Sequence, residues 1–191
     1  MKNHSMIFDE FFEDPRRAKA LINMQDMEDV KYDDGVTYPN IAHLPDSVAA
    51  EIKKNMHQIV GPAFTPVLSF ARYTFEDTKP PHWAHSDGNI ARFLALIYLN
   101  DGPDAEKFGT AVLRHKEFGF ETHPTDDFQK EILLGHANKK DEWEITFECP
   151  ARFNRCLLLN ADLVHASMGE YGKDRSDGRL VISVFFDLVY R

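Results

Sequence analysis

The sequence predicts a mainly β fold with helices at its N-terminal end, in which short strands form a sandwich or barrel. Its 191 residues are the size of about one domain. Residues 1–63 show helical spacing of apolar positions, whereas 64–191 contain short β-branched and aromatic runs between Gly, Pro, Asp and Asn clusters. We therefore expect a single domain, 1–191, in which a helical layer (1–63) supports a β core (64–191).

Two helices are expected in the supporting layer. Asp14 and Pro15 can cap and begin a helix over 16–27, and its apolar residues form one stripe: Ala18, Leu21, Ile22 and Met24. A loop follows, with Asp33, Asp34, Gly35 and Pro39. A second helix begins at Asp46 and Ser47, has apolar residues three and four apart, and ends at Gly61-Pro62.

Six apolar or β-branched runs predict the strands of the core: 67–75, 93–99, 110–113, 143–147, 156–159 and 180–190. The connection over about 117–141 interrupts this spacing, and its part 126–136 has the pattern of a short helix. A long insertion in a compact β domain is either a functional lid or binding loop, or a surface elaboration.

The composition excludes several classes of protein. The formal net charge of −9 argues against a nucleic-acid partner, because phosphate neutralisation needs the opposite sign. No apolar run approaches the roughly 20 residues of a membrane span, and residues 1–10 lack the apolar stretch of a secretory signal. Two cysteines, Cys149 and Cys156, make no disulfide framework and are expected to be buried, so we expect a cytoplasmic protein.

A histidine and a carboxylate two residues apart, His85 and Asp87, would share one face of a strand. His165 follows another predicted strand and could add a third ligand from a distant part of the chain. Two histidines and one carboxylate hold one face of an octahedral Fe(II) and leave three positions open. His82 is a competing ligand, but it follows Pro80-Pro81, which indicates a loop.

The last predicted strand begins with a cation. Arg179 precedes an apolar run, and its planar guanidinium can pair with a carboxylate through two hydrogen bonds. Ser183, four residues on, shares the strand face of Arg179, and we expect both to bind the same ligand. Tyr98 places a phenol in an apolar strand, where its hydroxyl needs a partner. Arg175 is the rival to Arg179, but it lies in a Gly- and Asp-rich loop.

In this order, these motifs resemble the Fe(II)- and 2-oxoglutarate-dependent dioxygenases, and the prolyl-hydroxylase-like branch most closely. The resemblance covers about residues 68–189 and rests on these pieces: Arg72-Tyr73, His85-Ser86-Asp87, the run 95–100, the run 109–113, Phe153-Asn154-Arg155, His165 and Arg179. It implies a double-stranded β-helix, a cupin-like jelly roll with helices packed on its larger sheet, which agrees with the helix-then-strand pattern.

The resemblance also implies roles. His85, Asp87 and His165 would be the iron ligands. Arg179 would pair with the distal carboxylate of 2-oxoglutarate, Tyr98 would donate to the same carboxylate, and Tyr73 would line the cosubstrate pocket. The cosubstrate would chelate the metal beside O2, and its decarboxylation to succinate would drive oxidation of a C–H bond. Because Asp87 is present where halogenating members carry a small residue, the resemblance favours hydroxylation.

Four neighbouring residues have open roles. Arg114 and His115 either contact substrate or face solvent; Arg155 anchors the turn before Cys156 or contacts a ligand; Trp83 packs in the core or walls the pocket. The sequence thus predicts a 2-oxoglutarate-dependent Fe(II) dioxygenase that hydroxylates an amino-acid, peptide or protein side chain, or a related small molecule. The alternatives are a jelly-roll metal-binding or sensor module without redox catalysis, and a hydrolase that uses the metal to activate water.

Overall fold

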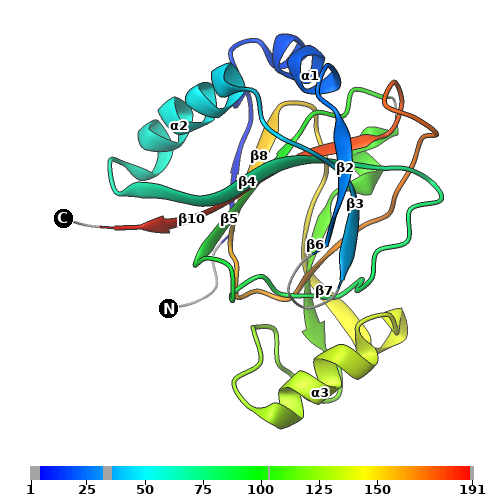
Figure 1. Ribbon diagram of the computed structural model, residues 1–191. Coiled ribbons are helices and arrows are strands. Elements are labelled where there is room, and N and C mark those ends of the chain that lie inside the picture. Colours follow the sequence, from blue (N-terminus) through cyan, green and yellow to red (C-terminus); the bar gives the residue numbers. More distant parts are fainter. Residues whose placement is uncertain (1–4, 32–35, 103, 190–191) are drawn as a thin grey trace.

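Two antiparallel sheets form the body of the protein in a computed structural model, which describes residues 5–31, 36–102 and 104–189 (Figure 1). The larger sheet has seven strands in the order β1-β8-β5-β10-β4-β3-β2, and the smaller one has three in the order β7-β6-β9. The strands of the larger sheet are β1 (Met6–Phe8), β2 (Met27–Lys31), β3 (Thr37–Ala42), β4 (Phe64–Thr74), β5 (Phe93–Tyr98), β8 (Arg155–Asn160) and β10 (Arg179–Leu188). Those of the smaller sheet are β6 (Thr110–His115), β7 (Trp143–Cys149) and β9 (His165–Ser167).

Helices α1 (Pro15–Asn23) and α2 (Asp46–Val60) cover the outer face of the larger sheet. Asp14 caps α1 by accepting a hydrogen bond from the Arg17 amide, and Pro15 occupies the first turn, where no amide hydrogen is needed. Ile22 on α1 and Met56 on α2 are fully buried against alternate residues of the central strands. Burial of these apolar faces is the main force that holds the helices on the sheet.

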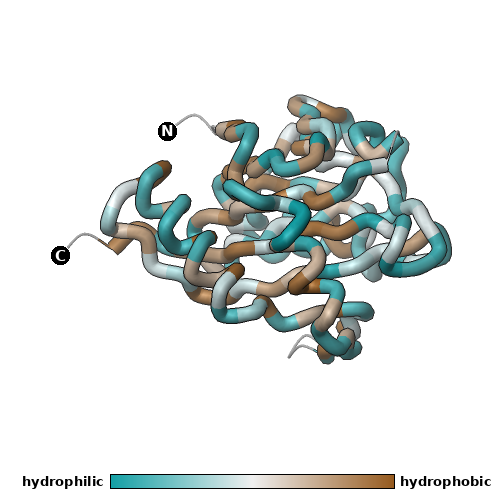
Figure 2. The backbone as a smooth tube through the Cα atoms, turned by 90° about the horizontal axis from the view of Figure 1, so that it is seen from above, coloured by the Kyte–Doolittle hydropathy of each residue, from teal (hydrophilic) through white to brown (hydrophobic). Residues whose placement is uncertain are grey.

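The opposite faces of the same strands meet the smaller sheet. Alternation along β5 sends Ala95 and Ile97 toward the helices and Leu94, Leu96 and Tyr98 into the space between the sheets. Figure 2 shows the hydrophobic residues concentrated in the central strands and the hydrophilic ones mostly at the periphery. A chain whose strands are buried on both faces carries the nearly continuous apolar runs seen in its sequence.

Part of the N-terminal prediction is wrong, because residues 1–63 are not wholly helical. Helix α1 ends at Asn23 rather than Met27, and Met27 begins the edge strand β2. Strand β3 includes Pro39, which we expected in a loop; the β2–β3 pairing is irregular opposite it, between Glu28 and Val30, where a missing amide hydrogen is tolerated. Strands β1, β2 and β3 therefore extend the larger sheet. Asp33, Asp34, Gly35 and Tyr190 of the predicted elements lie outside the described residues.

The predicted insertion lies between β6 and β7. It contains helix α3 (Asp127–His136), which sits at the end of the molecule away from α1 and α2 (Figure 1). A short 3-10 turn (Lys140–Glu142) joins it to β7. None of the helices in the described part of the chain has the length and apolar character that a membrane crossing requires.

Candidate metal centre

Three predicted ligands meet at one end of the space between the sheets. One nitrogen or oxygen atom from each of His85, Asp87 and His165 lies within 4.8 Å of the other two. The backbones of His85 and His165 form an isolated antiparallel bridge, with N–O distances of 3.1 and 2.8 Å. Asp87 is fixed by its amide, which donates to the Ala161 carbonyl at 2.9 Å. Two segments far apart in the sequence are thus joined directly at the site.

Backbone carbonyls orient both histidines. Nδ1 of His85 lies 3.2 Å from the Trp83 carbonyl, and Nδ1 of His165 lies 2.9 Å from the Leu163 carbonyl. Because a carbonyl only accepts, each Nδ1 carries a proton, and Nε2 is the atom of each ring that is left to bind a metal. The Nε2 of His165 points at Asp87, 3.4 Å from its Oδ2. This arrangement is typical of metal-binding histidines, whose second nitrogen donates to a carbonyl or carboxylate.

Burial and mutual charge shift the pKa of all three ligands. Burial and the neighbouring His165 lower the pKa of His85 to about 4, so this ring is neutral near pH 7. Burial raises the pKa of Asp87, but the hydrogen bond to His165 and the charges of His85 and His165 together outweigh it, and the net direction is down. Burial alone lowers the pKa of His165, but Asp87 outweighs it and the net direction is up. A charged carboxylate therefore faces an imidazole that holds a proton, and a divalent cation bound by both groups would displace that proton.

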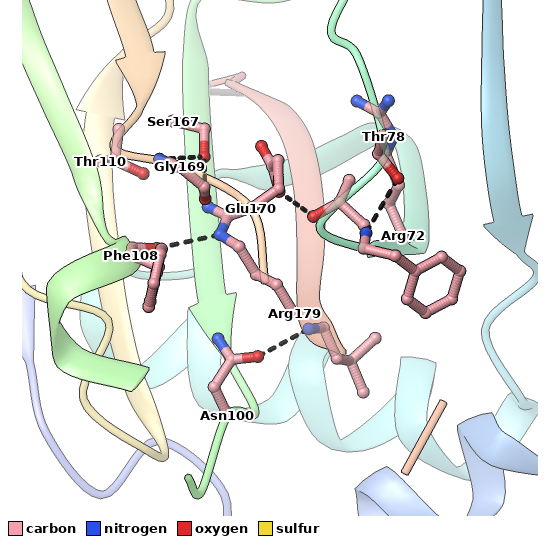
Figure 3. Close-up of polar contacts among 12 residues, drawn as sticks. Arg72, Thr78, Asn100, Phe108, Thr110, Ser167, Gly169, Glu170 and Arg179 are labelled. Atoms are coloured by element: carbon pink, nitrogen blue, oxygen red, sulfur yellow. Dashed lines mark hydrogen bonds and ion pairs between the residues drawn. The ribbon is translucent and has the colours of Figure 1, made fainter. Parts of the chain in front are cut away.

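Arg179 enters the same interior from the start of β10. Its side chain is buried, its Nε donates to the Phe108 carbonyl at 2.9 Å, and its Nη1 lies 3.9 Å from Oε2 of Glu170 (Figure 3). Glu170 also accepts a hydrogen bond from Thr74. A buried guanidinium can pair with an anionic ligand, which would here share the cation with Glu170.

Tyr98 and Ser183 also lie on the inner face. The hydroxyl of Tyr98 donates to Oγ1 of Thr110 at 2.8 Å. Burial raises the pKa of Tyr98, and the charge of Arg179 opposes that rise, so the phenol stays protonated and can donate. Ser183 is two residues beyond Val181 and four beyond Arg179 on β10, which places all three on one strand face.

The structure places Tyr73 away from the cosubstrate pocket that the resemblance implies. Its side chain packs in the core between the helices and the larger sheet, and its hydroxyl donates to Oδ1 of Asn23. Burial raises its pKa to about 12. The neighbouring Arg72 takes the inner face instead, opposite Val181 of β10. The assignment of Tyr73 was wrong because a strand position one residue away faces the other side of the sheet.

The rival residues have other partners. His82 is not in the group of converging ligand atoms. Nη1 of Arg175 donates to the carbonyls of Asn23 and Gln25, each at 2.8 Å, and so caps the C-terminal end of α1 rather than facing solvent. Arg155 pairs with Asp9 at 2.7 Å and also donates to the Pro150 carbonyl, which supports the anchoring role.

Of the residues with open roles, Arg114 forms ion pairs with Glu121 and Glu144 on the surface, whereas His115 is fully buried and faces neither solvent nor the metal centre. The indole nitrogen of Trp83 donates to the Ser167 carbonyl at 3.0 Å. Trp83 therefore connects the segment before His85 to β9, in addition to orienting the ring of His85.

The insertion is hydrogen-bonded to both ligand segments, which the sequence did not indicate. At its C-terminal end, Asn138 accepts from the Trp83 amide at 2.8 Å and donates to the Pro81 carbonyl at 3.1 Å, while the Ala84 amide donates to the Ala137 carbonyl at 2.8 Å. At its N-terminal end, the Val164 amide donates to the Glu121 carbonyl, and Nδ1 of His123 lies 2.9 Å from Oγ of Ser86. Residues 117–141 thus clamp the chain on either side of the ligands.

Comparison with known proteins identifies the fold. No known family profile matches the chain, and no curated protein is similar to it in sequence. The solved structures of three proteins are similar over nearly the whole chain. The non-heme alpha ketoglutarate dependent epimerase SnoN from nogalamycin biosynthesis is 16% identical, with a TM-score of 0.60 over 96% of this chain and 78% of that one.

The carbocyclase SnoK of the same biosynthesis, also described as non-heme and alpha ketoglutarate dependent, is 12% identical, with a TM-score of 0.57 over 97% of this chain and 79% of that one. HygX from Streptomyces hygroscopicus, whose structure holds nickel, 2-oxoglutarate and hygromycin B, is 14% identical, with a TM-score of 0.56 over 95% and 82%. The chain has the fold of these enzymes. At these identities the similarity describes the fold, and the chemistry must be argued from the residues.

Proposed function

We propose that this chain is an Fe(II)- and 2-oxoglutarate-dependent oxygenase that hydroxylates a C–H bond and releases succinate and CO2. The observation that carries the proposal is the orientation of His85 and His165: both Nδ1 atoms donate to carbonyls, so that Nε2 is the metal-binding atom of each ring, beside Asp87. The fold shared with SnoN and HygX supports it.

The donor set fits Fe(II). Two imidazoles and one carboxylate are the ligands of non-haem iron oxygenases, and three ligands leave room for a chelating cosubstrate and O2. His85 is neutral and available, while the pair of Asp87 and His165 can exchange its proton for a cation. Bound iron and 2-oxoglutarate would supply the oxidising chemistry, and the protein would supply positioning and shielding.

The residues around the centre have separate tasks in this proposal. Arg179 binds the distal carboxylate of the cosubstrate and shares its charge between that carboxylate and Glu170. The hydroxyl of Tyr98 donates a hydrogen bond to the same carboxylate, in place of the hydrogen bond that it donates to Thr110. Ser183 offers a second hydroxyl on the strand face of Arg179. The apolar residues between the sheets exclude water from the oxidation: Leu96, Val112, Leu157, Val181 and Phe185.

We assign the fold to the double-stranded β-helix and the chain, as one domain, to the prolyl-hydroxylase-like branch. The substrate class that follows is an amino-acid, peptide or protein side chain, with a small molecule as the other class because HygX holds hygromycin B. The free, buried thiols of Cys149 and Cys156 support a reducing, cytoplasmic setting.

An anaerobic titration tests the proposal without knowledge of the substrate. Metal-free protein receives Fe(II) and then 2-oxoglutarate, and the visible spectrum is recorded. We expect the metal-to-ligand charge-transfer band of chelated keto acid, followed by succinate when O2 is admitted. If iron binds and no band forms, the chain is instead a jelly-roll metal-binding or sensor module. If iron does not bind at all, the metal assignment is wrong.

A further inference from the structure

A second group of metal-binding side chains lies where residues 117–141 join the smaller sheet. His115 ends β6, His136 ends α3, and Glu142 belongs to the turn before β7. One potential ligand atom from each lies within 4.8 Å of the other two, and Nε2 of His115 is 2.9 Å from Nδ1 of His136. The iron centre proposed above uses none of these residues.

The three backbones are fixed independently of any metal. His115 pairs with Trp143 in the β6–β7 ladder. Glu142 directly precedes Trp143 in the chain, so this pairing brings Glu142 close to His115. The Lys116 amide donates to the Glu142 carbonyl at 2.9 Å. The indole of Trp143 donates to the His136 carbonyl, also at 2.9 Å. A site whose ligands are held by such contacts needs little reorganisation to bind an ion.

We propose that His115, His136 and Glu142 bind a divalent zinc ion. Two imidazoles and a carboxylate are a ligand set that zinc accepts, with water as the fourth ligand. Two nitrogens on one tetrahedral zinc, each at about 2.05 Å, would be about 3.3 Å apart, so the observed pair has to open only slightly. His136 and Glu142 are half-buried, which gives the ion and its water a path to solvent.

The surroundings of His115 show why it is a histidine. Its ring is fully buried against the rings of Phe118, Phe120 and Trp143, with centroids 4.9–5.4 Å away. An apolar ring would fill such a cage without the cost of burying two nitrogens. Here one nitrogen faces His136, and the other accepts a hydrogen bond of 3.4 Å from the Phe118 amide. Zinc at Nε2 would transfer the ring proton to Nδ1 and break that long contact.

The site would fasten α3 to the sheet. Ala137 and Asn138 directly follow His136 and hold the segment before His85. Zinc between β6, α3 and the following turn would therefore hold residues 137 and 138 in place, and through them the segment before the proposed iron ligand His85.

Zinc content of the folded chain tests the proposal. Metal-free wild-type protein and three variants, His136→Asn, Glu142→Gln and His43→Asn, are dialysed against zinc, and bound zinc is measured by mass spectrometry. His43 is an exposed histidine outside the cluster, so it controls for adventitious surface binding. We expect His136→Asn to bind one equivalent less than wild type, Glu142→Gln to lose the same equivalent or hold it more weakly, and His43→Asn to match wild type.

The difference in bound zinc between wild type and His136→Asn decides the question. It does so whether or not the proposed iron centre also binds zinc, because that centre is the same in both proteins. Equal zinc in both would overturn the second site. A loss that also occurs in His43→Asn would show surface binding only and would overturn it too. Because Trp143 bonds the backbone of residue 136, His136→Asn keeps that contact, and Glu142→Gln leaves both histidines in place should His136→Asn fail to fold. Titration with Co²⁺ adds a readout: the absorption of a four-coordinate ion should vanish in His136→Asn, weaken or vanish in Glu142→Gln, and persist in His43→Asn.

Discussion

Two clusters have the same composition, two histidines and one acid each, and they differ in the partners of their ring nitrogens. In the first, Nδ1 of both histidines meets a carbonyl, which leaves Nε2 free to bind. In the second, Nδ1 of His115 meets an amide, and Nε2 is used by His136. Neighbouring backbone thus decides which nitrogen carries the proton, and with it whether a ring must move its proton before it binds a metal.

The largest expected effect separates the clusters by function. His165→Ala removes a ligand of the first cluster, and we expect loss of the charge-transfer band and of succinate formation to background. His136→Asn removes a ligand of the second cluster and should leave succinate formation within about twofold. Succinate release with saturating Fe(II) measures both. Equal loss of activity in the two variants would show that the clusters do not act separately. His82→Asn is the matched control beside His85, since His82 is outside both clusters.

A smaller effect is expected at the two arginines that compete for the cosubstrate. Arg179→Ala removes the buried cation, and losing one partner of a buried charge pair costs about 2–5 kcal/mol, so 2-oxoglutarate should bind roughly 30-fold or more weakly. Arg175→Ala removes hydrogen bonds to the end of α1 and should lower the melting temperature without changing cosubstrate affinity. Titration of the charge-transfer band measures the affinity. If Arg175→Ala bound 2-oxoglutarate more weakly than Arg179→Ala does, Arg175 would be the residue that binds the cosubstrate.

The next effect concerns the hydrogen bonds by which residues 117–141 hold the segment before His85. Asn138→Ala removes one acceptor and one donor that hold residues 81–83, so the carbonyl of Trp83 no longer fixes the ring of His85 as firmly. We expect Fe(II) to bind about tenfold more weakly, the lower end of the range for residues behind metal ligands. Gln129→Ala is the control, because Gln129 bonds only Thr125 and Asp126 within the insertion. If both variants bind Fe(II) like wild type, the insertion does not position His85.

Sequence reasoning found the elements whose patterns are local. Helices α1 and α2 and the central strands have continuous apolar periodicity, and both motif histidines lie in the group of converging ligand atoms, although His85 forms an isolated bridge rather than part of the expected strand. Strand β2 was missed because it is a short, charged edge strand, and its neighbour β3 was missed because it is short and contains a proline.

What remained beyond the sequence depends on contacts between distant segments. Tyr73 and Arg72 could not be assigned to a face, since a shift of one residue reverses the side of a strand. Nor did any motif mark Asn138, whose partners lie 55 and 57 residues away. Such contacts are set by the packing of the insertion, which has no periodic pattern that predicts them.

The last effect concerns the proton that the first cluster must release. The pKa of His165 lies above the ordinary 6.5, whereas that of His85 is about 4, so near neutral pH only His165 exchanges a proton for the metal. As pH falls below the pKa of His165, the proton competes with Fe(II) and affinity should drop by about tenfold per pH unit. Anaerobic Fe(II) titrations between pH 6 and 8 measure the slope. A slope of two protons would show that His85 also holds a proton that the metal must displace. A slope of zero would show that Asp87 does not hold a proton on His165, and the comparison of the two clusters would then rest on ring orientation alone.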